Sequence, residues 1–179
     1  MLLNDVALME HRVTLVGALG GLLAHAERRL EPAYLMGVTG HAFRLTLDLV
    51  ISPSAPHELS FHDVFPLWER LGAWFKRVAA RPADPGYADV RAEVIGRVAR
   101  AVEGGRPAIV YDLLASEEYG LVVGVDGERW ACLTPAAPAT PQWMDVAEWP
   151  PASHAAFTRA EVITLLDISP DFDRQAAEV

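Results

Sequence analysis

The chain has 179 residues, of which 51% are hydrophobic and 22% charged, and its formal net charge is −9 with a pI near 5.0. This length suits one core of ordinary size, so we expect residues 1–179 to form a single domain. The negative charge argues against nucleic acid as a partner, and the apolar runs are too short to cross a membrane. The single cysteine, Cys132, rules out an internal disulfide and suits a reducing, cytoplasmic location.

Apolar residues at helical spacing predict a first helix from Val13 to Leu30. Three glycines within it, Gly17, Gly20 and Gly21, fall on nearly one face of the helix. Each glycine costs a helix roughly 1 kcal/mol relative to alanine. We therefore expect a sheet or a second helix to approach the backbone closely on this face.

After the first helix, the sequence predicts a loop or short helix that ends at residues 37–40. Strict alternation of apolar and polar residues then predicts a strand over residues 43–51. A second helix is expected from Asp63 to Leu71, with Asp63 as N-cap because Pro66 is tolerable only in a first turn. Gly72 is the expected stop.

Residues 73–79 are predicted to form a strand. The pair Asp84-Pro85 has the form of an N-cap followed by proline at the first helical position, and it predicts a third helix that ends at residues 104–105. Glu93 and Arg97 are four residues apart within it, so we expect an ion pair on its solvent side.

The second half of the chain is expected to be rich in strands, at residues 107–111, 119–125, 128–133 and 161–168. Asp126-Gly127 favours a tight hairpin turn between the second and third of these. The apolar run 121–123 indicates a strand covered on both faces. Residues 135–151 are predicted to be a proline-rich loop, and a helix is expected at the C-terminus. Helices beside a largely antiparallel sheet predict the α+β class.

Three segments, residues 35–44, 105–110 and 118–126, resemble papain-like cysteine-peptidase-type domains. The branch concerned includes bacteriocin-leader-processing peptidases and the N-terminal domain of the butirosin-biosynthesis acyltransferase. The resemblance implies a papain-like α+β fold with a largely antiparallel sheet packed against helices. It also places the loop at residues 37–40 near the cleft.

The catalytic residues of that family are missing from this chain. The resemblance implies a cysteine at the start of the first helix, where this chain has residues 10–14 without cysteine. The family histidine would stand where Glu118 or Tyr119 lies, and residues 132–134 offer no carboxylate or amide. We therefore carry no catalytic residue over, and the resemblance implies fold rather than activity.

Some side chains remain candidates for ligand contact. Thr14 with His11 as base has the composition of an activated hydroxyl, although a threonine near a helix start is usually a cap. Arg44, on the polar face of the strand after His41, has a planar fork that suits a carboxylate or phosphate, although an exposed strand arginine is the simpler reading. Near the central strand, a carboxylate such as Glu118 is either a base with a raised pKa or the partner of an arginine. The candidate ligand-binding residues are His11, Thr14, His41, Arg44, Glu118 and Tyr119.

Other chemically capable residues have simpler explanations. The metal-capable side chains His57, Glu58, His62 and Asp63 lack any standard zinc spacing, so a solvated loop with an N-cap explains them, and no metal or other cofactor is expected. Cys132 lies in an apolar, strand-like setting and is expected to be a buried structural thiol. The tryptophans of the 135–151 loop either cover a pocket or pack that loop onto the body.

These patterns favour a non-catalytic papain-like domain that binds a small ligand or a protein partner. An acyltransferase or hydrolase built on His11, Thr14, His41 and Glu118 is an alternative, and it requires these side chains to converge in one cleft. A structural or oligomerising protein is a second alternative, which a large exposed apolar patch would indicate.

Overall fold

The computed structural model describes residues 1–43, 61–69, 71–151 and 158–172. Its α-helices are α1 (Thr14–His25), α2 (Pro32–Val38), α3 (Phe61–Glu69) and α4 (Tyr87–Glu103). Short 3-10 helices are η1 (His41–Phe43), η3 (Leu113–Ala115) and η4 (Val146–Glu148). The strands are β1 (Ala73–Ala80), β2 (Ala108–Tyr111), β3 (Tyr119–Asp126), β4 (Arg129–Thr134), β5 (Ala137–Asp145) and β6 (Ala160–Ile168).

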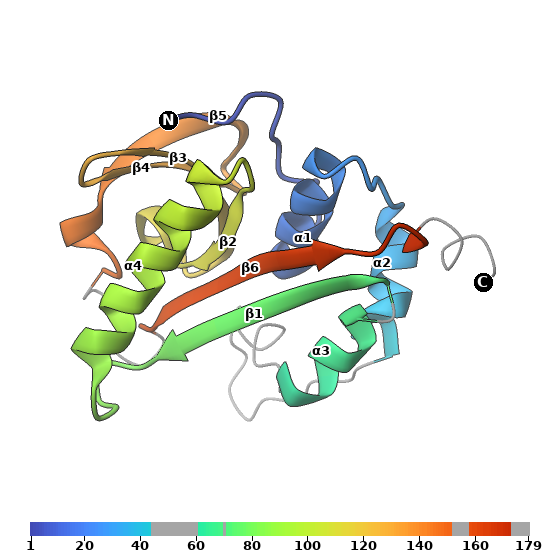
Figure 1. The fold of residues 1–179 in the computed structure, drawn as a ribbon, viewed down its shortest axis with the longest axis horizontal. Helices are drawn as coiled ribbons and strands as arrows, with labels where there is room; N and C mark the ends of the chain where they lie inside the picture. Colours follow the sequence, from blue (N-terminus) through green and yellow to red (C-terminus); the bar gives the residue numbers. More distant parts are fainter. Residues whose placement is uncertain (44–60, 70, 152–157, 173–179) are drawn as a thin grey trace.

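The six strands form one sheet in the order β1-β6-β2-β3-β4-β5, and every neighbouring pair is antiparallel. Helix α4 crosses one face of the sheet over β6 and β1, whereas α1 lies behind it (Figure 1). The α+β class with a largely antiparallel sheet is therefore confirmed. Among the described residues, none of the helices has the length and apolar character needed to cross a membrane.

Each face of the sheet has its own hydrophobic core. Leu121 and Val123 of β3 pack with α1, whereas Val122 between them packs with Val98 and its neighbours on α4. Side chains of a strand alternate between faces, so a strand in the middle of this sheet is apolar on both. The prediction that residues 121–123 form a strand covered on both sides is confirmed.

The glycine face of α1 is covered mainly by the N-terminal segment of the chain. The predicted sheet contributes only Leu121 of β3, which lies close to Gly21. A Cβ at Gly17 would lie 2.6 Å from the backbone oxygen of Met9, and a Cβ at Gly21 would collide with the backbone oxygen of Ala7. The Met9 N–H donates to the Gly17 carbonyl at 3.1 Å. The glycines thus let an extended segment lie directly on the helix backbone.

Two predicted helix boundaries were wrong. Helix α1 ends at His25 rather than Leu30, because Glu27 has a left-handed φ of 61° and the Arg28 N–H turns back to the Leu23 carbonyl at 2.8 Å. Helix α3 begins at Phe61, which places Asp63 inside the helix and excludes it as the N-cap. Pro66 is consequently an interior residue of α3 and not part of a first turn.

Asp84 is not the N-cap of α4. Its carboxylate accepts the Arg81 N–H at 2.7 Å within a turn, and the helix begins later, after Gly86, whose φ is 76°. The expected ion pair between Glu93 and Arg97 is present, with 2.8 Å between Oε1 and Nε. The left-handed stop at Gly72, with φ 75°, is also confirmed.

The predicted loop at residues 135–151 contains a strand instead. β5 pairs with β4 at the edge of the sheet despite Pro138 and Pro141. Proline is tolerated in an edge strand because its missing N–H can face away from the neighbouring strand. The strand predicted over residues 43–51, apart from Phe43 in η1, and the C-terminal helix expected beyond residue 172 lie outside the described residues.

Candidate functional site

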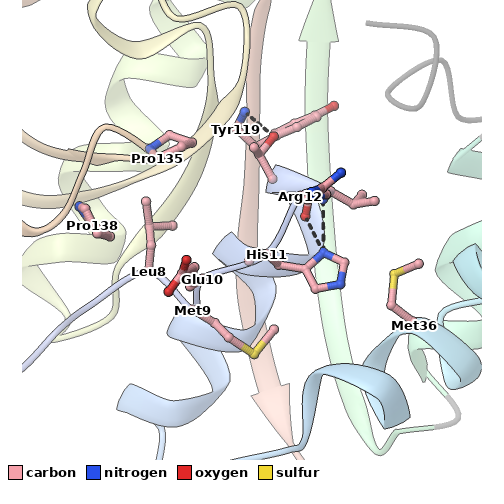
Figure 2. A pocket seen from close by; sticks show the side chains of 12 residues that line it. Leu8, Met9, Glu10, His11, Arg12, Met36, Tyr119, Pro135 and Pro138 are labelled. Atoms are coloured by element: carbon pink, nitrogen blue, oxygen red, sulfur yellow. Dashed lines mark hydrogen bonds between the residues drawn. The ribbon is translucent and has the colours of Figure 1, made fainter. Parts of the chain in front are cut away.

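A cavity of about 920 Å³ opens where the N-terminal segment meets the start of α1. One wall is the extended chain from Leu8 to Val13, and Met36 of α2 lies on the opposite side (Figure 2). The lining is more apolar than polar. Its members are Leu8, Met9, Glu10, His11, Arg12, Val13, Thr14, Gly17, Met36, Tyr119, Pro135 and Pro138.

The N-terminal end of α1 belongs to this cavity. Val13, the N-cap residue, has an extended backbone and supplies no side-chain cap, and Thr14 and Gly17 of the first turn are also part of the lining. Uncapped N–H groups and the helix dipole make such an end attractive to oxygen acceptors and negative charge. The cavity therefore combines apolar walls with one polar end.

Thr14 connects the start of α1 to the start of β3. Its hydroxyl oxygen accepts the Tyr119 N–H at 3.2 Å, and Thr14 is only 4% exposed. The hydroxyl thus satisfies a buried backbone donor. Thr14 acts here as a structural acceptor rather than as the helix N-cap.

His11 is held against its own chain instead of against Thr14. Its Nδ1 accepts the Val13 N–H at 3.0 Å and lies 3.3 Å from the Val13 carbonyl oxygen. No hydrogen bond joins His11 to the Thr14 hydroxyl in the described part of the chain, so the structure does not contain the base–hydroxyl pair that a hydroxyl nucleophile needs.

The phenol of Tyr119 is also engaged. It donates to Glu161 Oε1 at 3.1 Å and accepts from Arg159 Nη2 at 3.1 Å. Glu161 is fully buried, pairs with both Arg159 and Arg77, and shares this cluster with Tyr111, over whose ring the Arg159 guanidinium lies at 3.9 Å. Burial is the main cause that holds the pKa of Tyr119 well above its usual value. This phenol stays protonated and structural at neutral pH.

The candidate ligand-binding residues are therefore only partly brought together. His11, Thr14 and Tyr119 line the cavity, whereas His41 and Glu118 are not part of its lining. His41 Nδ1 lies 2.8 Å from the Thr39 hydroxyl. Burial raises the pKa of Glu118. Arg44 lies outside the described residues, and the ligand role of all six candidates stays a prediction.

Sequence patterns missed several residues around the site. Met9, Met36, Pro135 and Pro138 line the cavity, and no local pattern distinguishes them from other apolar or turn residues. The buried Glu161 did have a signal, because it occupies the apolar phase of its strand together with Ile163. A carboxylate in that phase indicates a buried partner of opposite charge.

The remaining candidates have mostly structural settings. Cys132 is buried, and burial raises the pKa of its thiol to about 12, as expected of a structural cysteine. Trp149 packs against Trp130 and donates to the Tyr111 carbonyl at 3.0 Å, whereas Trp143 is 43% exposed. No group of three or more metal-capable side chains occurs in the described part of the chain, and the 57–63 cluster falls outside the side chains described there.

Neither a family model nor a curated protein matches this sequence. Among solved structures, the chain is similar to the peptidase domain of Streptococcus ComA, a bifunctional ABC transporter involved in a quorum-sensing pathway. The identity is 15% and the TM-score 0.48, over 90% of this chain and 98% of that chain. A likeness at this identity and TM-score assigns neither a family nor an activity to this chain.

Proposed function

We propose that this protein is a non-catalytic binding module that holds a small, largely apolar ligand in the cavity at the start of α1. A volume of about 920 Å³ lies within the range of roughly 300–1,000 Å³ that is usual for small-molecule sites. The apolar walls favour an apolar ligand body. The N-terminal end of α1 favours an oxygen acceptor on that ligand, such as a carbonyl or carboxylate.

The observation that carries this proposal is the bonding of the polar groups in the cavity. Thr14 accepts from Tyr119, His11 accepts from Val13, and the Tyr119 phenol is bonded to Glu161. The Thr14 hydroxyl oxygen, the His11 Nδ1 and the Tyr119 phenol are thus already bonded within the protein itself. Binding needs no such group to be free, whereas catalysis does.

A thermal-shift screen of small apolar carboxylates and amides tests the proposal. A hit should raise the melting temperature of the unaltered chain, and Met36→Trp should abolish that rise because an indole would occupy the cavity. Ala92→Trp is the matched control, since Ala92 is exposed on α4, on the other face of the sheet.

Three outcomes would count against the proposal. A screen without hits would contradict the binding of a small apolar ligand. An equal loss of the melting-temperature rise in Met36→Trp and Ala92→Trp would exclude the cavity as the binding site. Turnover of an ester or amide hit that is abolished by Thr14→Val or His11→Ala but survives in Thr14→Ser would favour the enzyme alternative.

A further inference from the structure

A second, smaller groove lies on the opposite face of the sheet, between the C-terminal half of α4 and the end of β6. It has a volume of about 270 Å³, and Figure 1 shows α4 crossing the sheet on this side. Three of its lining side chains are arginines, Arg97, Arg100 and Arg106, and no acidic residue belongs to the lining. On a chain of net charge −9, this is a local concentration of positive charge.

Strand β1 adds a fourth cation beside the groove. Lys76 is the cross-strand partner of Thr164, which is part of the lining, and the Thr164 hydroxyl donates to the Lys76 carbonyl at 3.4 Å. Cross-strand partners project from the same face of a sheet. Lys76 therefore projects from the α4 face of the sheet, beside the arginines.

The three guanidinium groups differ in the hydrogen bonds that they already make within the protein. Arg106 Nη1 donates to the Leu166 carbonyl at 2.6 Å, which fixes this side chain to β6 while leaving other N–H groups available. Arg97 donates from Nε to Glu93. Arg100 makes no side-chain hydrogen bond or ion pair with the described part of the chain.

Arg100 nevertheless has a defined place. A Cβ at Gly96 would lie 3.2 Å from Arg100 Nη1 and 3.8 Å from its Cζ, so the guanidinium lies back along the helix over the glycine. A side chain at position 96 would crowd it. Arg100 in the last turn complements the helix dipole, but this explanation does not extend to Arg106, which lies beyond the helix.

We propose that this groove binds a phosphate group. Guanidinium N–H groups form charge-assisted, paired hydrogen bonds with phosphate oxygens, and a doubly charged anion offsets the repulsion among the converging arginines. Leu166 is 52% exposed at the edge of the groove and offers an apolar contact to the rest of a phosphate ester. The size of the groove suits a phosphate with one ring rather than a large ligand.

The test is a titration of the full chain with phenyl phosphate and with inorganic phosphate, followed by backbone amide NMR. The expected shifts lie at the end of α4 and along residues 164–166, and phenyl phosphate should bind more tightly because its ring reaches Leu166. Arg100→Ala should weaken binding about tenfold, as expected for loss of charged hydrogen bonds.

Arg81→Ala is the charge-matched control. Arg81 follows β1 at the end where β1 pairs with residue 160, about 16 Å along the strand from residue 165. It should leave binding unchanged. Arg100 has no side-chain partner in the described chain, so Arg100→Ala should leave the fold intact and its effect on binding can be interpreted directly.

Absence of binding would overturn the proposal, as would equal weakening by Arg81→Ala and Arg100→Ala, which would indicate attraction to net charge alone. Binding of inorganic phosphate as tight as that of phenyl phosphate would remove the role of Leu166 and leave phosphate recognition standing. Shifts confined to the cavity at the start of α1 would also overturn it.

Discussion

Replacing Gly21 with alanine should destabilise the protein, although the same change normally strengthens a helix. In an unobstructed helix interior, alanine gains up to about 1 kcal/mol over glycine. At position 21, the new Cβ would collide with the Ala7 carbonyl and would lie 3.1 Å from Leu121 Cδ1. Overpacking of this kind costs about 1–3 kcal/mol, so we expect a net loss of about 2 kcal/mol or a displaced N-terminal segment.

Gly37→Ala is the matched control for this prediction. Gly37 also lies in an α-helix, α2, and nothing lies within 4 Å of the Cβ that alanine would add. It should be neutral or stabilising by up to about 1 kcal/mol. Gly21→Ala should instead lower the melting temperature by about 4–8 °C, the shift expected for about 2 kcal/mol in a domain of this size.

The measurement is chemical denaturation of both variants beside the unaltered chain. Equal or greater stability of Gly21→Ala, matching Gly37→Ala, would refute the reasoning. It would mean that the N-terminal segment does not lie on the glycine face of α1. The wall of the cavity formed by residues 8–13 would then have no support.

Three further predictions concern buried polar groups. Thr14→Val should lower the free energy of unfolding by about 1–3 kcal/mol in denaturation experiments, because the Tyr119 N–H loses its acceptor. Thr14→Ser keeps a hydroxyl and should lower it less, and equal losses would contradict the role of Thr14 as this acceptor. Glu161→Gln should destabilise by about 3–5 kcal/mol because it removes the buried carboxylate that two partly buried arginines share. Asp126→Asn, in an exposed pair, should cost less than about 1 kcal/mol, and similar losses for the two variants would contradict the burial argument. Cys132 should resist alkylation at pH 8 until the chain unfolds, since its raised pKa leaves almost no thiolate, and rapid native-state labelling would show an accessible thiol.

Much of the fold could be predicted from local patterns. An apolar run identified β3, and the Gly72 stop followed from the need for a left-handed residue. The prediction that Asp84 caps the third helix was wrong because an acidic residue before proline forms turns as readily as caps. β5 was missed because its prolines indicate a loop, and only its place at the sheet edge makes them acceptable.

The candidate site was harder to predict because it depends on contacts between distant residues. The glycine face of α1 correctly indicated a close approach, but its spacing does not identify what approaches. The link from Thr14 to Tyr119 spans 105 residues, and no local pattern encodes it. His11 and Thr14 suggested a catalytic pair by type alone, whereas their backbone hydrogen bonds argue for a structural role.

The most direct test of the central proposal is a crystal structure of the chain with the strongest small apolar hit from the thermal-shift screen. The proposal predicts an intact ligand in the cavity, with its apolar part between Met9 and Met36 and an acceptor oxygen at the start of α1 near Thr14. A ligand bound elsewhere, or found cleaved or attached to the Thr14 hydroxyl, would contradict a non-catalytic binding cavity at this position.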